Sequence, residues 1–202
     1  MKFEDFLGRI TLKDKTEYRE ETQLDGSIHA IWEFYPSREL LESLLLDIFE
    51  NYYDQVIFGP CIQGAVFECH TKQPPKKINY LDGYLTVNFG EWHIHLCIGD
   101  HHGDKHHPCP PELAEWRRCK RGELTRMYTN PPIAGHAPLS YSMALFNGRN
   151  EQMISFFLPN PFLTDKFRVT KSPDWSRLKL WNHIRIKFLK LDEDLGPFED
   201  LA

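Results

Sequence analysis

Residues 84–98 read YLTVNFGEWHIHLCI, which is two alternating segments on either side of Gly90-Glu91. A two-residue loop that begins with glycine is typical of a type II′ turn, so we expect a β-hairpin with strands at 84–89 and 92–98. The expected register places Asn88 opposite His93, Thr86 opposite His95 and Tyr84 opposite Cys97. In this register the aliphatic side chains share one face, and a shift of one residue would mix the faces. The stretch therefore predicts an antiparallel sheet.

Segments on both sides of this hairpin extend the pattern. Alternating residues predict strands at 28–34, 57–70, 140–146 and 152–158, the last two forming a second hairpin. Ser37 can cap a helix whose apolar residues recur at i, i+3 and i+4 as far as Tyr52. Pro111 is expected to open a second helix that runs to about Met127. The fold class is therefore α+β, an antiparallel sheet of five or more strands with helices packed mainly on one face.

Composition limits the kind of protein this can be. The chain has 202 residues, 41% of them hydrophobic, which suits a single globular domain over 1–202 with an acidic tail from about residue 192. No apolar run is long enough to span a membrane, and the first residues lack the apolar core of a secretion signal. The net charge of −5 argues against indiscriminate binding to nucleic acid. We expect a cytoplasmic protein whose five cysteines are reduced thiols.

Histidine and cysteine gather in one part of the chain. Nine of the fifteen His and Cys residues fall between His93 and Cys119. His93 and His95 lie two residues apart on the expected strand, about 6.6 Å apart along one face, so both imidazoles can bind one metal ion. Cys97 shares the face but lies about 13 Å from His93, too far for all three to bind the same ion. The candidate pairs are His93 with His95, or His95 with Cys97, and the first pair is preferred because a thiolate is less common at open catalytic sites.

A third ligand must come from another segment. Gly99-Asp100 can turn the chain so that His101 or His102 returns to the site, and Glu68 or His70 can serve if their strand is a neighbour. Such a ligand set suits Zn²⁺, Fe²⁺, Mn²⁺ or Ni²⁺. An open coordination position would hold water and support hydrolysis or oxidation of a small molecule.

The remaining residues of this face are polar but uncharged. Tyr84, Thr86, Asn88 and Cys97 suit the lining of a pocket, because solvent-facing strands carry mostly Lys, Glu and Thr. The alternative is a hydrogen-bonded structural face in a non-catalytic binding or assembly protein.

The segment His93-Ile94-His95-Leu96-Cys97-Ile98 resembles the strand motif of the histidine-triad nucleotide hydrolases. That resemblance implies that His95 attacks a phosphate, but the third histidine of the motif is replaced by Cys97. The His-x-His pair also resembles the cupin metal site, although Asp100 departs from the usual carboxylate spacing. The two likenesses cover only a few residues and neither identifies the chain.

A different function is suggested by residues 166–190, which hold eight basic residues and one acid, Asp174. Trp175, Trp181 and Phe188 are interleaved with the bases, a pattern found in anion and nucleic-acid binding. The acidic residues that follow from Asp192 can neutralise this segment, and Trp175, Leu178 and Trp181 have the spacing of a buried helix stripe. The sequence gives no oligomeric state.

Overall fold

The computed structural model describes residues 16–62, 64–129 and 137–194. Six strands form one antiparallel sheet in the order β1-β2-β9-β10-β11-β3, and β6-β7-β8 form a second, smaller one. The strands are β1 (Glu17–Thr22), β2 (Ile28–Phe34), β3 (Ile57–Gly59), β4 (Cys61–Ile62), β5 (Ala65–Val66), β6 (Lys77–Leu81), β7 (Tyr84–Asn88), β8 (His93–Cys97), β9 (Cys119–Tyr128), β10 (Leu139–Asn147) and β11 (Gln152–Phe157). The helical segments are α2 (Arg38–Asn51), α3 (Pro111–Arg117), the 3₁₀ helix η1 (Trp175–Leu178), α4 (Lys179–His183) and the π-helix η2 (Ile184–Phe188). The predicted α+β class and the antiparallel sheet are confirmed.

Both predicted hairpins are present. β7 and β8 pair in the predicted register, with Thr86 opposite His95, and Phe89 N–H donates to the Trp92 carbonyl across the turn at 3.0 Å. β10 and β11 pair as the second hairpin. These segments were predictable because one face of each is buried, which makes every other register costly.

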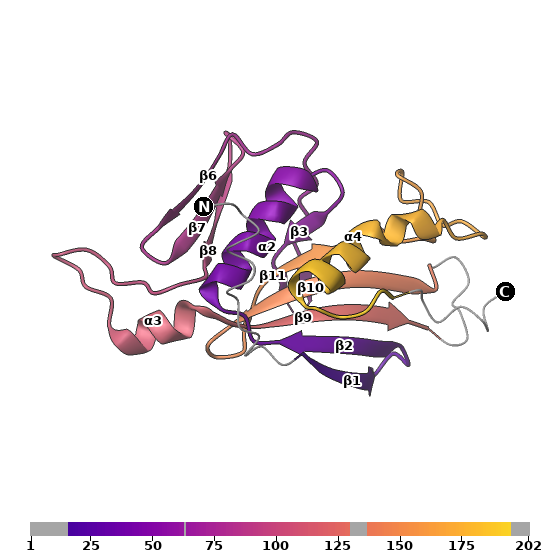
Figure 1. Cartoon of the computed structure of the whole chain (residues 1–202), viewed down its shortest axis with the longest axis horizontal. Coiled ribbons are helices and arrows are strands. Elements are labelled where there is room, and N and C mark those ends of the chain that lie inside the picture. The colour runs from indigo at the N-terminus through magenta and orange to yellow at the C-terminus, as the bar shows by residue number, and fades with distance from the viewer. Residues whose placement is uncertain (1–15, 63, 130–136, 195–202) are drawn as a thin grey trace.

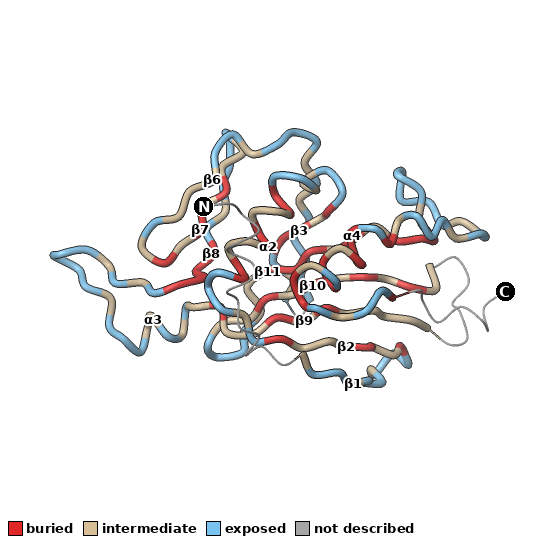
Figure 2. The backbone as a smooth tube through the Cα atoms, viewed as in Figure 1, coloured by how far each residue is buried: buried red, intermediate tan, exposed pale blue. Residues whose placement is uncertain are grey.

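The helix predicted after Ser37 is α2. The Ser37 hydroxyl accepts from the Leu40 amide, and the apolar stripe of α2 is wholly buried. Phe49 on this helix lies edge-on to Phe58 of β3 and Phe156 of β11, at ring distances of 5.2 and 5.7 Å. In Figure 1, α2 and α4 lie over the large sheet and the smaller sheet stands beside α2. Figure 2 shows that burial is concentrated where these layers meet.

The helix predicted from Pro111 to Met127 is wrong. Helix α3 ends at Arg117, and residues Cys119–Tyr128 form β9, a central strand between β2 and β10. Gly122 explains the change, because the Phe34 ring from the neighbouring strand occupies the space that a Cβ atom would need there. A glycine in a helix interior is unfavourable, whereas here it makes room for a core aromatic.

The single strand predicted at 57–70 is also wrong, because the chain doubles back within it. Phe58 and Cys69 form a bridge with amide-to-carbonyl distances of 3.0 and 2.8 Å, and β4 pairs with β5 between them. Gly59 permits the reversal, since the carbonyl oxygen of Phe67 lies where a Cβ atom would be. β1 and β6 were not predicted.

The later part of the basic segment 166–190, from Leu178 to Leu189, is largely built into the domain, whereas the earlier part is mostly exposed. Leu178 and Trp181 are buried, as their spacing predicted, whereas Trp175 is 38% exposed. Arg177 pairs with Asp165, Lys187 pairs with Asp47, and Arg185 is itself buried. Several of its charges thus have partners within the protein.

Some expectations fall outside the described residues. Most of the acidic tail, residues 195–202, is among these. Within the described ranges, no helix is long and apolar enough to cross a membrane.

Candidate functional site

The structure brings the two predicted metal ligands together on β8. The rings of His93 and His95 lie 4.7 Å apart, and Nδ1 of His95 shares a 2.7 Å hydrogen bond with the Thr86 hydroxyl. That bond fixes the ring and leaves Nε2 of His95 for another partner. Both histidines are exposed, so this face lies open to solvent and does not enclose a hollow.

The predicted third ligands lie elsewhere. His101 Nδ1 donates to the Asp82 carboxylate at 2.9 Å, and its ring packs edge-on against Tyr84. His102 is exposed, and its backbone amide donates to the same carboxylate. Across residues 16–62, 64–129 and 137–194, no three His, Cys, Asp or Glu side chains are grouped so that they could hold a metal ion.

The remaining residues of the predicted lining have local roles. Cys97 is buried and its thiol donates to the Gly99 carbonyl, and burial raises its pKa above the ordinary thiol value. Burial likewise raises the pKa of Tyr84. Asn88 Oδ1 accepts from the Gly90 amide and so stabilises the hairpin turn. The hydrogen bonds of Cys97 and Asn88 are local contacts that stabilise the β7–β8 hairpin and its ends.

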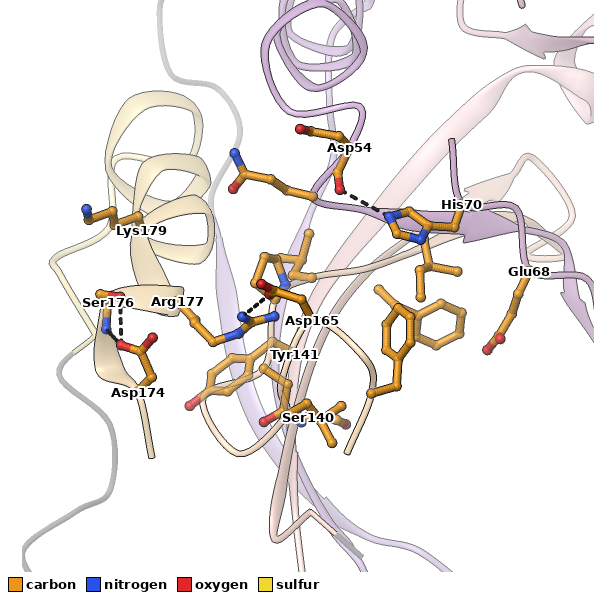
Figure 3. Close-up of a pocket in the computed structure, with 18 residues that line it drawn as sticks. Asp54, Glu68, His70, Ser140, Tyr141, Asp165, Asp174, Ser176, Arg177 and Lys179 are labelled. Atoms are coloured by element: carbon orange, nitrogen blue, oxygen red, sulfur yellow. Dashed lines mark hydrogen bonds and ion pairs between the residues drawn. The ribbon is translucent and has the colours of Figure 1, made fainter. Parts of the chain in front are cut away.

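A cavity of about 710 Å³ lies in a different part of the molecule, beside the edge strand β3 (Figure 3). Its walls come from the loop before β3, the ends of β10 and β11, the connection 158–174 and the helical segments η1 and α4. The volume falls within the usual range for small-molecule sites. The lining residues are Asp54, Gln55, Ile57, Glu68, His70, Ser140, Tyr141, Phe157, Leu158, Pro159, Asn160, Leu163, Asp165, Phe167, Asp174, Ser176, Arg177 and Lys179.

Arg177 and Lys179 supply positive charge on one side of the cavity. Arg177 Nη1 donates to Asp165 Oδ1 at 2.6 Å, but the Asp165 side chain is 92% exposed. An ion pair with so exposed a partner contributes little stability, so another anion can replace Asp165. Arg177 Nε is buried without a hydrogen-bond partner. The guanidinium therefore has capacity for a second acceptor.

Asp174 does not compete for Arg177. Its carboxylate caps η1, accepting from the Ser176 amide at 3.1 Å and from the Ser176 hydroxyl at 2.7 Å. The Ser176 hydroxyl and amide hold the pKa of Asp174 below its usual value, so the group is an anion at neutral pH.

The opposite side of the cavity carries His70, Glu68 and Asp54 (Figure 3). His70 Nε2 donates to the Asp54 backbone carbonyl at 3.1 Å. Phe167 reaches across from the 158–174 connection and lies edge-on to the His70 ring at 5.9 Å. The imidazole is thereby oriented, with Nδ1 left for a further partner.

Apolar side chains also line the cavity, namely Ile57, Phe157, Leu158, Leu163 and Phe167. The cavity thus has largely apolar walls, with Arg177 and Lys179 on one side together with Asp165 and Asp174, and with His70, Glu68 and Asp54 on the other. Glu68 and His70 were named from the sequence as possible residues of the pocket at His93 and His95, and they line this different cavity instead. Arg177 and Lys179 belong to the basic segment that suggested anion binding. Tyr141, Asp165 and Phe167 had no signal in the sequence, because their positions depend on how distant segments meet.

Comparison with known protein families gives a match over most of the chain. The profile of the Family of unknown function (DUF7676) matches residues 18–190. No curated protein matches the chain. The matched range includes every residue that lines the cavity.

Proposed function

Because the chain belongs to the Family of unknown function (DUF7676), whose description names no ligand, we propose from the cavity itself that the protein binds a small amphipathic anion there. The observation that carries this proposal is the state of Arg177. Its guanidinium lines an apolar cavity, pairs with an exposed carboxylate through one nitrogen only, and keeps a second nitrogen unpartnered.

Arginine binds carboxylates and related anions best when two of its nitrogens donate side by side. Asp165 engages only Nη1, so a ligand anion that engages Nε as well would form a stronger pair. Lys179 lines the same side and has no ion pair with the described residues. The two cations favour a carboxylate, sulfonate or phosphate head group.

The charge distribution also sets the orientation of the ligand. Glu68 and Asp54 would repel an anion on the His70 side, where none of the described lysines or arginines lines the cavity. On the Arg177 side the ligand would displace the exposed Asp165, while the Asp174 carboxylate is bonded to Ser176. The head group is therefore placed at Arg177, with the apolar body along Phe157 and Leu163. His70 Nδ1 can contact a polar group at the far end of the ligand. The protein is in this proposal a binding protein for small molecules, and the cavity alone assigns no reaction.

A pair of fluorescent probes tests the proposal. 1-Anilinonaphthalene-8-sulfonate has an aromatic body and one sulfonate, and N-phenyl-1-naphthylamine has the same ring system without the anion. We expect saturable binding of the sulfonate and at least tenfold weaker binding of the neutral probe, because a hydrogen bond to a charged group contributes roughly 1.5–3 kcal/mol.

Two matched variants locate the binding. Arg177→Gln combined with Lys179→Gln should weaken sulfonate binding about tenfold or more and leave the neutral probe unaffected. Arg168→Gln combined with Lys171→Gln removes the same charge from two exposed residues that do not line the cavity, so it should change neither affinity. Equal affinities for the two probes, or equal losses in the two double variants, would refute the proposal.

A further inference from the structure

We propose that a second site, formed by Arg126, Arg185 and Tyr141 around Trp32, binds a small inorganic anion. The site lies on the side of the large sheet that faces α4, and Tyr141 is the residue that it shares with the lining of the cavity. Arg126 and Tyr141 are directly opposite each other on β9 and β10. Arg185 approaches them from η2.

Two guanidiniums approach the same indole ring. Cζ of Arg185 lies 4.4 Å from the Trp32 ring centre, and Cζ of Arg126 lies 5.5 Å from it. Trp181 closes the group, since its ring lies 5.7 Å from Trp32 and 4.9 Å from Tyr141. The aromatic faces stabilise each cation, but two like charges at one ring also repel each other.

One carboxylate serves these two cations. Arg126 Nη1 donates to both oxygens of Asp194 at 2.9 and 2.8 Å, and Trp181 Nε1 donates to Oδ2 at 3.0 Å. Arg185 is just 7% exposed, and its Nε donates to the Asp192 backbone carbonyl at 3.1 Å. Burial lowers the pKa of Arg185, although the Asp194 and Asp192 carboxylates favour its charged form. Because Asp194 is also bonded to Arg126 and Trp181, a further anion beside Arg185 would offset the cost of burying two cations.

Three donors in the group have no acceptor. They are Nε of Arg126, Nη1 of Arg185 and the hydroxyl of Tyr141, and all three atoms are buried. Unpartnered buried polar atoms are rare in folded proteins, so three in one cluster need an explanation. Burial is the main cause of the raised pKa of Tyr141, which keeps its hydroxyl protonated and able to donate.

A small anion such as chloride or phosphate is the proposed acceptor for these donors. Its charge would offset Arg185, and the Asp194 carboxylate, held by Arg126 and Trp181, would exclude a second anion. A larger ligand is disfavoured because the three donor atoms are shielded from solvent.

Thermal unfolding at constant ionic strength tests this site. Sodium gluconate, whose anion is too bulky for the site, is replaced stepwise by sodium chloride, sulfate or phosphate. We expect the unfolding midpoint to rise saturably with one or more of the small anions, by about 5 °C or more at a hundredfold excess over the dissociation constant. Identical midpoints in all four salts would overturn the proposal.

Three variants assign the effect. Arg185→Met keeps an unbranched apolar side chain and removes the guanidinium with its charge, so the anion-dependent rise should vanish while stability in gluconate is kept or increased. Tyr141→Phe retains the ring and removes one donor, so it should lower anion affinity several-fold, and it decides the matter if Arg185→Met does not fold. Arg168→Met changes an exposed arginine and should keep the full rise. An unchanged rise in both Arg185→Met and Tyr141→Phe would refute the site.

Discussion

The Phe34 ring lies directly over the backbone of Gly122, in the space that any larger residue on β9 would occupy. The two residues are opposite each other in the β2–β9 register, and Phe34 is fully buried. This contact explains why β9 tolerates a glycine at this position.

Gly122→Ala should therefore destabilise the protein by about 1–3 kcal/mol, the usual cost of overpacking a core. Chemical denaturation measures the change. The double variant Gly122→Ala with Phe34→Leu should be less destabilised than the sum of the two single variants, because the smaller side chain makes room for the new methyl group. Additive losses would show that the ring and the glycine are not coupled.

The same contact shows where sequence patterns suffice and where they fail. The 84–98 hairpin was predictable to its register because its aliphatic residues alternate without interruption. Residues 119–128 were misread because the bases on β9 suggested a helix face, and the meaning of Gly122 depends on Phe34, far away in sequence. β1 is built from charged residues whose pairing partners, such as Glu33 and Glu123, lie on other strands.

The cavity shows the same limit for the candidate site. The clustering of His93 and His95 was visible in the sequence, and the structure does place their rings together. The cavity instead joins residues of the loop before β3 with residues near 140, 165 and 177, and no local spacing connects these segments. Glu68 and His70 were named in advance only for the expected site at His93 and His95, on a strand that the structure does not contain, and Arg177 and Lys179 only as part of the basic segment.

The exposed position of His93 and His95 predicts a small effect on folding. Replacing both with alanine should cost less than about 1 kcal/mol, since surface substitutions seldom change stability by more than half that amount each. Leu85→Ala, on the buried face of the same hairpin, should cost about 2–5 kcal/mol. Urea unfolding of the two variants gives the comparison, and a loss of similar size in both would show that the histidines are structural.

The hydrogen bonds of Asp47 predict that the stability of the protein depends on pH. Its carboxylate accepts from His183 at 2.5 Å and from Lys187 at 3.0 Å, and so joins α2 to α4 and η2. Burial would raise the pKa of Asp47, but the hydrogen bonds from His183, Lys187 and Asn51 outweigh it and hold the pKa below its ordinary value of 3.8. The unfolded chain therefore binds the proton more readily, so this stabilisation is complete above about pH 4 and is lost as the pH falls through the lower folded value.

Asp47→Asn should accordingly lower the free energy of unfolding by about 1–3 kcal/mol at pH 7, and its difference from the wild type should shrink as the pH falls below about 4. Glu50→Gln, an exposed residue on the same helix, is the matched control and should change little at any pH. If the difference in unfolding free energy between Asp47→Asn and the wild type stays constant down to pH 2, the charge of the Asp47 carboxylate does not cause the stabilisation.

Asp82 contacts the loop between β8 and α3, which holds His101, His102, His106 and His107. It lies in the turn between β6 and β7 with a φ of 47°, and its carboxylate accepts from the amides of His102 and Gly103 at 2.8 and 2.9 Å. Asp104 has a similar role within the loop, accepting from the amides of His106 and His107 at 2.7 and 2.8 Å.

Hydrogen exchange resolved by residue can measure separately how each of these two carboxylates holds the loop. Asp82→Ala should speed exchange at 102 and 103, and Asp104→Ala should speed it at 106 and 107 only. Acceleration of all four amides in both variants would show that the loop opens as one unit, and that neither carboxylate holds its own half.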